Sequence, residues 1–175
     1  MLIDLTKLLS REGSSLEVEA PIEMSHFKMS KGEQYKLLEK TPLYLTLIHD
    51  KDQVIKLSGH GKVTCMVPCA RCLKRVSQAI DLDFEHRVNM LDLTADEDEA
   101  EMAGCITADK CLDADLLAHS EILVHWPNKV LCKEDCKGLC PTCGKDLNEG
   151  ACSCDHEDLD PRMAAFKEIF NDQKS

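Results

Sequence analysis

The chain has 175 residues, of which 43% are hydrophobic, and carries a formal net charge of −11 at pH 7. This length allows one hydrophobic core, or one core with a small additional module. No apolar run approaches the length that crosses a membrane, and the acidic charge gives no general attraction for nucleic acid phosphates. The N-terminal residues lack the basic and uninterrupted apolar regions of a secretion signal, which predicts a cytoplasmic protein.

The first half of the chain is predicted to be an antiparallel β domain preceded by a short amphipathic helix. Apolar and polar side chains alternate most clearly over residues 79–91, as in a half-buried strand. Gly59 and Gly61 suggest a bulge or a bend in the strand that contains them. Four or five strands with short loops favour a mostly antiparallel sheet or a small barrel. The strands are predicted over residues 16–25, 43–48, 54–67 and 79–91.

The second half of the chain is predicted to be helical, with a cysteine-rich insertion. A helix over residues 112–126 ends at Pro127, with Leu112, Leu116 and Leu123 on one stripe. A second helix, over residues 160–170, begins with an Asp-Pro pair at its N-terminus. We therefore expect an α+β protein with three parts: a helix and β domain at 1–91, an acidic linker loop at 92–110, and a helix, zinc knuckle and C-terminal helix packing on the β domain at 111–175.

Eight of the eleven cysteines occur in close pairs. In a reducing cytosol, clustered thiols more often hold a metal than form disulfides, and an odd total fits a disulfide framework poorly. The remaining cysteines, Cys65, Cys105 and Cys111, are interpreted as small buried hydrophobic residues. The pairs are Cys69/Cys72, Cys132/Cys136, Cys140/Cys143 and Cys152/Cys154.

The pair Cys140-x-x-Cys143 gives the strongest metal signal. Two intervening residues let both sulfurs reach one ion, and Gly144 permits the backbone conformation of a zinc knuckle. Cys152 and Cys154 can close a tetrahedral site. The same eight cysteines could also form two four-sulfur sites, or one site that joins Cys69 and Cys72 to the C-terminal module. The spacing therefore predicts structural Zn²⁺, with one or two ions.

Enzymatic and DNA-binding alternatives have weaker support. The spacing Cys136-x3-Cys140-x2-Cys143 is typical of radical SAM iron–sulfur sites, but only 32 residues follow it. A Cys-x-x-Cys dithiol redox pair would be expected within a βαβ pattern, which the chain lacks. A zinc-bearing DNA-binding regulator would need a basic recognition helix. A thiol-redox or iron–sulfur protein is the alternative function; no catalytic residues are predicted.

One stretch is locally basic. Residues 62–75 carry four cations and no acidic residue, and surround the Cys69/Cys72 turn. Such a tip could contact RNA phosphates, although surface cations on a hairpin are equally common. The predicted contact residues are Lys62, Arg71, Lys74 and Arg75.

The motif order resembles that of the YceD-like family of large ribosomal RNA subunit accumulation proteins. The resemblance covers about residues 40–170 and rests on CARCL, an acidic stretch, LCKEDCKGLCPTCGKDLN, CSC and DPR. Its motif positions in this chain are Cys69, Arg71, Cys72, Leu73, Cys132, Cys136, Gly138, Leu139, Cys140, Pro141, Cys143, Gly144, Leu147, Asn148, Cys152 and Cys154.

This resemblance implies a bacterial or organellar cytoplasmic protein that is needed for normal accumulation of large-subunit ribosomal RNA. It implies no enzymatic activity. The family includes members without the full C-terminal cysteine set, which favours a structural role for the metal. We therefore expect a non-enzymatic ribosome biogenesis factor. Its expected partner is large-subunit rRNA or the pre-ribosome, which it would bind through rRNA or through a basic ribosomal protein. We expect neither membrane association nor a small-molecule substrate.

Overall fold

The computed structural model describes residues 1–29, 32–91 and 104–154. The chain forms two units. The first unit comprises residues 1–68 and 75–130, and the second comprises residues 69–74 and 131–175. Most of the predicted acidic linker loop and the predicted C-terminal helix lie outside the described residues.

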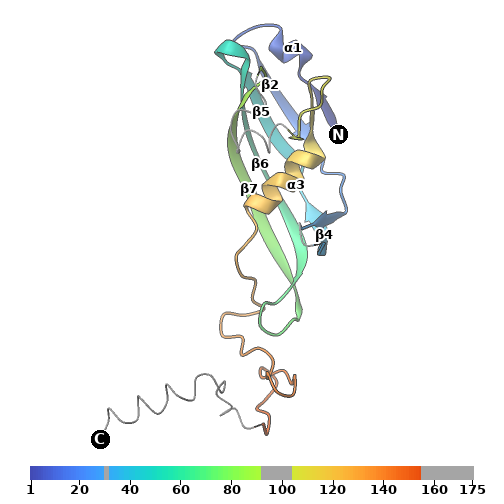
Figure 1. Cartoon of the computed structure of the whole chain (residues 1–175), viewed down its shortest axis with the longest axis vertical. Coiled ribbons are helices and arrows are strands. Elements are labelled where there is room, and N and C mark those ends of the chain that lie inside the picture. The colour runs from blue at the N-terminus through green and yellow to red at the C-terminus, as the bar shows by residue number, and fades with distance from the viewer. Residues whose placement is uncertain (30–31, 92–103, 155–175) are drawn as a thin grey trace, which may run out of the picture. The chain divides into compact units, whose positions relative to one another are not determined.

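The first unit is built on a six-stranded antiparallel sheet, which confirms the predicted mostly antiparallel architecture (Figure 1). The strand order is β2-β5-β6-β4-β3, and β7 pairs with β6. A 3₁₀ turn at Lys51–Gln53 joins β5 to β6. The strands are β2 (Ser15–Ala20), β3 (His26–Lys28), β4 (Gln34–Lys40), β5 (Leu43–His49), β6 (Val54–Pro68) and β7 (Arg75–Asn89).

The hairpin of β6 and β7 organises this sheet. Each strand has 15 residues, and their pairing is continuous from Val54–Asn89 to Pro68–Arg75. The period-two alternation of β7 determines which side chains enter the core. Its inward-facing apolar side chains are buried, as predicted: Ile80, Leu82, Phe84 and Val88.

Of the bulge or bend predicted at Gly59 and Gly61, the bulge is wrong. Pairing with β7 is regular through both glycines, and the register shift lies in β4 instead, between Leu37 and Glu39. Gly59 serves close packing. A Cβ atom there would lie 2.5 Å from Phe84 Cζ and 2.7 Å from Leu45 Cδ2. The missing side chain leaves room for these two core residues on neighbouring strands.

The predicted N-terminal helix is only partly confirmed. The single turn α1 (Thr6–Leu9) follows a strand, β1 (Leu2–Asp4). β1 pairs with β8 (Cys111–Asp113), so the start of the chain forms a separate two-stranded sheet. Local apolar spacing could not reveal this strand, because its partner lies more than 100 residues away in the sequence.

Helix α3 (Ala114–Val124) confirms the predicted helix and begins later than expected, because Leu112 lies in β8 (Figure 1). The Asp113 carboxylate caps the helix by accepting a 2.9 Å hydrogen bond from the Asp115 N–H. The predicted apolar stripe does not face the core, since Leu116 and Leu123 are 50% and 36% exposed. The buried side chains of α3 are Ala114, Leu117, Ala118, Glu121 and Ile122.

The core of the first unit is mainly aliphatic, as the low aromatic content of 4% requires. Phe27 is the largest of the fully buried side chains, and its ring stacks on Trp126 at 5.2 Å between centroids. Among the described residues, no helix combines the length and the apolar character needed to span a bilayer.

We predict that Gly59→Val destabilises the first unit by about 1–3 kcal/mol, because the added side chain overlaps Phe84 and Leu45 in a packed core. Valine has a high intrinsic preference for strands, so the same substitution at a site with free space would stabilise the protein. Thermal and urea unfolding of the purified chain measure the change. Gly104→Ala is the control, since a Cβ atom there meets nothing within 4 Å. Equal stability of wild type and Gly59→Val would contradict the prediction.

Candidate metal centres

The structure brings four cysteines from two distant segments into a first cluster. Cys69 and Cys72 lie between the end of β6 and the start of β7, and Cys132 and Cys136 follow some 60 residues later. All four sulfur atoms lie within 4.8 Å of one another. Three of these residues, Cys69, Cys72 and Cys136, are buried.

A tight turn places the first two sulfurs side by side. The Cys69 N–H donates to the Lys74 carbonyl at 2.8 Å, and the Leu73 N–H donates to the Cys69 carbonyl at 3.0 Å. Leu73 adopts a left-handed conformation with φ of 60°. This conformation costs a non-glycine residue about 1–2 kcal/mol, so surrounding contacts must hold it.

Arg71 joins the two segments of the first cluster. Its Nη1 donates to the Cys136 carbonyl at 2.6 Å, and its own carbonyl accepts the Leu139 N–H at 3.2 Å. Gly138, with φ of 78°, allows this approach, since a Cβ atom there would lie 3.1 Å from the Arg71 carbonyl oxygen. The Arg71 N–H also donates to Cys69 Sγ at 3.5 Å. Arg71 therefore positions the cluster through both its backbone and its side chain.

The second cluster matches the ligand set predicted from spacing: Cys140, Cys143, Cys152 and Cys154, with sulfurs within 4.8 Å of one another. The Cys140 N–H donates to the Lys145 carbonyl at 2.8 Å, and the Gly144 N–H donates to the Cys140 carbonyl at 2.9 Å. Gly144 has φ of 72°, the left-handed conformation expected of it. Cys143 is exposed, so this cluster is more accessible than the first.

Each cluster contains a thiol with a lowered pKa. A hydrogen bond from the Cys72 N–H is the main cause that lowers the pKa of Cys69 to about 6. A hydrogen bond from the Cys143 N–H likewise lowers the pKa of Cys140 to about 6. The sulfur of Cys72 raises the pKa of Cys132 to about 12, and that of Cys143 raises the pKa of Cys154 to about 12. The thiols thus lie close enough to compete for ionisation, which a bound cation would relieve.

The sulfur geometry of the first cluster fits a single tetrahedral ion, and the four sulfurs of the second cluster lie within 4.8 Å of one another. Zinc–sulfur bonds of about 2.3 Å place tetrahedral sulfurs about 3.8 Å apart. Cys69 Sγ lies 3.8 Å from Cys136 Sγ, and Cys72 Sγ lies 3.5 Å from Cys132 Sγ. These separations exceed the 2.05 Å of a disulfide, and none of the eleven cysteines, all of which lie in the described part of the chain, forms one. A four-iron cluster would separate its cysteine ligands further, since each sulfur binds a different iron.

A set of four sulfurs also indicates what kind of centre each cluster could be. Catalytic zinc keeps one coordination position for water or substrate, whereas structural zinc is enclosed by four protein ligands. A redox Cys-x-x-Cys pair usually places its reactive thiol at a helix N-terminus, and no described helix begins at either pair. Cys65, Cys105 and Cys111 belong to neither cluster, and the first two are buried, as predicted.

The four predicted contact cations are distributed over both units, and three have intramolecular partners. Lys62 Nζ lies 3.0 Å from Asp81 Oδ1. Arg71 contacts the Cys136 carbonyl, as described above. Lys74 Nζ lies 2.9 Å from both the Asp146 and Glu149 carboxylates, which raise its pKa. Arg75 is exposed at the start of β7.

Sequence reasoning missed Asp146 and Glu149, between the two cysteine pairs of the second cluster, and gave Asn148 only as a motif position without a role. Asp146 and Glu149 bind Lys74, and Asn148 Nδ2 donates to Cys136 Sγ at 3.5 Å. These residues connect the second cluster's loop to the first cluster. Their sequence signal is weak, because Asp and Asn are also ordinary turn residues.

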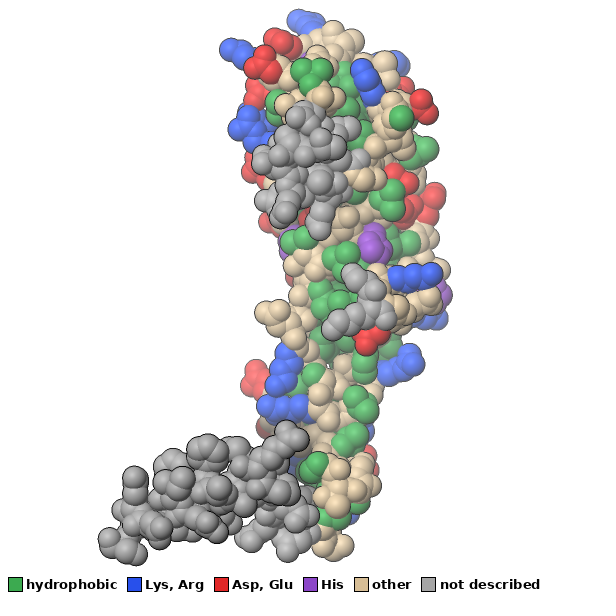
Figure 2. Space-filling view, in the orientation of Figure 1, with side chains coloured by type: hydrophobic (Ala, Val, Ile, Leu, Met, Phe, Trp, Pro, Cys, Tyr) green, Lys and Arg blue, Asp and Glu red, His purple; other side chains and the backbone are tan. Residues whose placement is uncertain are grey.

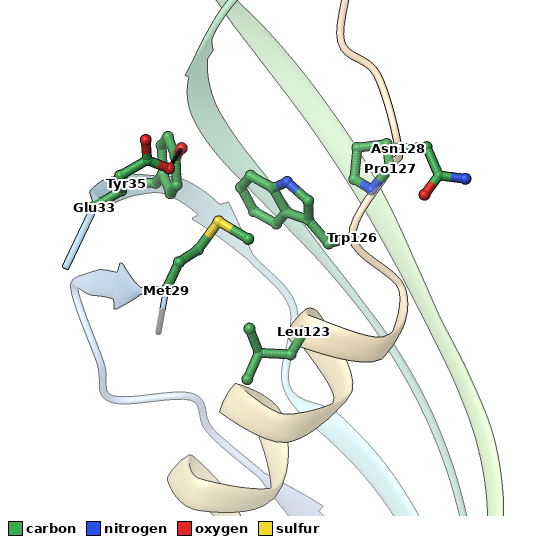
Figure 3. A pocket seen from close by; sticks show the side chains of 7 residues that line it. All are labelled: Met29, Glu33, Tyr35, Leu123, Trp126, Pro127 and Asn128. Atoms are coloured by element: carbon green, nitrogen blue, oxygen red, sulfur yellow. Dashed lines mark hydrogen bonds between the residues drawn. The ribbon is translucent and has the colours of Figure 1, made fainter. Parts of the chain in front are cut away.

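The first unit also has a cleft of about 560 Å³ beside the end of α3 (Figure 3). Trp126, Tyr35 and Met29 are among the residues that line it. The Glu33 carboxylate accepts a 2.7 Å hydrogen bond from the Tyr35 hydroxyl, and this bond raises the pKa of Tyr35 to about 12. The remaining lining residues are Leu123, Pro127 and Asn128.

Comparison with known proteins identifies related chains. The model of a family described as "Large ribosomal RNA subunit accumulation protein YceD" matches residues 57–170, a range that contains both cysteine clusters. Two proteins described as uncharacterized, Rv2926c of Mycobacterium tuberculosis and Mb2951c of Mycobacterium bovis, are each 26% identical over 97% of this chain and 81% of their own length. No solved structure matches.

We predict that removing bound metal with a chelator loosens residues 131–154 and leaves the sheet of the first unit intact. The second unit's buried cluster consists of Cys69, Cys72 and Cys136, with Leu131, Cys132 and Leu139 packed against it. So small an interior cannot order the segment once the sulfurs lose their ion. Hydrogen exchange read by mass spectrometry measures both regions. Unchanged protection of residues 131–154, or equal loss in β5, β6 and β7, would contradict the prediction.

Proposed function

Because this chain belongs to the YceD family, we propose that it is a non-enzymatic ribosome biogenesis factor that supports accumulation of large-subunit ribosomal RNA. The observation that carries this proposal is the family match over residues 57–170. That range includes most of β6, all of β7 and α3, and both cysteine clusters, so the match extends beyond a generic zinc knuckle.

We propose that each cluster holds one structural Zn²⁺, giving two ions per chain. The support is the all-sulfur ligand sets and the sulfur separations near those of tetrahedral zinc. When bound, zinc supplies folding free energy to a segment with few hydrophobic side chains. The residues of the chain position the ligands. Backbone N–H groups stabilise the sulfurs of Cys69 and Cys140, and Arg71 joins the two segments of the first cluster.

A basic ribosomal protein is the direct partner that the charge distribution favours. The chain has a net charge of −11, and Lys62 and Lys74 already lie against carboxylates. On the face shown in Figure 2, Asp and Glu side chains are interspersed with Lys and Arg, without a broad basic field among the described residues. Binding to rRNA through Lys62, Arg71, Lys74 and Arg75 is the competing outcome.

Deletion of the gene is expected to lower large-subunit rRNA relative to small-subunit rRNA, and the wild-type gene should restore the ratio. A control plasmid carrying Gly104→Ala should restore it equally, because this change meets no neighbouring atom. Quantification of both rRNA species measures the effect. An unchanged ratio in the deletion strain would refute the proposed function.

Affinity capture of the full chain from cells should recover large-subunit precursor particles. After extensive ribonuclease treatment, a basic ribosomal protein should remain bound. If binding disappears with ribonuclease and is weakened by Lys62→Glu with Arg75→Glu, rRNA is the direct partner instead. These two cations are chosen because Arg71 and Lys74 also support the fold of the second unit.

The purified protein is expected to be colourless and to contain two zinc ions per chain. Cys69→Ser should reduce the content to one ion, and so should Cys143→Ser, since each removes a ligand from a different cluster. Cys111→Ser, outside both clusters, should retain two ions. Elemental analysis after anaerobic purification measures the content. Iron with visible absorbance would support the iron–sulfur alternative, and metal-free protein with titratable thiols would support the redox alternative.

A further inference from the structure

We infer that the two clusters bind metal cooperatively, and that Asn148 is the positioning residue that couples them. This inference rests on the proposed metal centres and goes beyond them. The coupling element is the loop of residues 144–151, which lies between the cysteine pairs of the second cluster. A metal ion in the second cluster closes this loop, because its ligands lie on both sides of it.

The loop contacts both segments that build the first cluster. On the Cys136 side, the Leu147 N–H donates to the Gly138 carbonyl at 2.9 Å, and the Lys137 N–H donates to Asn148 Oδ1 at 2.9 Å. On the Cys72 side, Lys74 lies between the Asp146 and Glu149 carboxylates. The loop therefore links two segments that are far apart in the sequence.

Asn148 also reaches a sulfur of the first cluster directly. Its Nδ2 donates to Cys136 Sγ at 3.5 Å, and the same group donates to Asp146 Oδ1 at 2.6 Å. Four thiolates around a divalent cation leave a net negative charge on largely buried sulfur, which N–H donors stabilise. Asn148 thus supplies a hydrogen-bond donor to the first cluster. The position of this donor depends on the conformation of the second cluster's loop.

The second cluster needs only local closure of the chain, because its four ligands lie within a segment of 15 residues. An ion in the second cluster therefore holds Asn148, Asp146 and Glu149 ready for the first. By linkage, an ion in the first cluster must raise the affinity of the second by the same factor.

Cadmium-113 titration of the full-length protein, with competition by a chromophoric chelator, tests this inference. The two clusters should give separate resonances, assigned by Cys69→Ser and Cys143→Ser. Asn148→Ala should weaken cadmium binding at the first cluster by about 10- to 100-fold, the range found for residues that orient metal ligands. It should also shift the first cluster's resonance, which a general loss of stability would not do.

Lys145→Ala is the matched control within the same loop. The Lys145 side chain donates to the Ala151 carbonyl and does not contact the first cluster. This variant should leave the first cluster's affinity and resonance unchanged. An equal effect of Lys145→Ala and Asn148→Ala would overturn the specific role of Asn148.

Cooperativity itself is tested by removing the second cluster. Cys143→Ser with Cys152→Ser should lower the affinity of the first cluster at least 5-fold, and this loss should shrink when Asn148→Ala is already present. Far-UV circular dichroism of the first unit's sheet checks that the variants fold. Two ions bound with independent affinities would refute the coupling alone, whereas a wild-type protein that binds no ion would refute the metal centres as well.

Discussion

The second unit depends on its cysteine sulfurs, because it has little else to bury. Among its described residues, the apolar side chains packed with Cys69, Cys72 and Cys136 are those of Leu131 and Leu139. Hydrogen bonds and ion pairs between polar groups contribute little net stability where water competes for the same groups. In the proposed metal centres, sulfur–metal bonding would take the place of a hydrophobic core, and contacts such as that of Arg71 with the Cys136 carbonyl orient the two segments that carry the sulfurs.

Much of the fold and the four cysteines of the second cluster could be predicted from local sequence patterns. The alternation over residues 79–91 identifies β7, since side chains of a strand point alternately to its two faces. The spacing of Cys140, Cys143, Cys152 and Cys154 identifies four thiols that a short loop can bring together. What spacing could not decide is which distant pairs meet. Cys72 and Cys132 are 60 residues apart, and only the folded chain shows their sulfurs 3.5 Å apart.

The errors have a common physical origin in long-range packing. Leu116 and Leu123 lie on an apolar stripe of α3, but Leu117 and Ile122 form a competing one, and the sheet selects the latter. Leu2–Asp4 extends because β8 is available to pair with it. The motif includes Asn148 but does not reveal its role, since this depends on the position of Cys136, which the loop approaches only in three dimensions.

The position of Lys74 changes how the basic stretch around the first cluster should be interpreted. A cation near a turn is a natural candidate for phosphate contact, yet Lys74 lies 2.9 Å from Asp146 and from Glu149. A divalent ion with four thiolates also leaves local negative charge, which nearby cations offset. Lys74 is thus engaged by the module's own carboxylates and contributes less to long-range attraction of RNA. Together with the net charge of −11, this agrees with the basic protein partner proposed above.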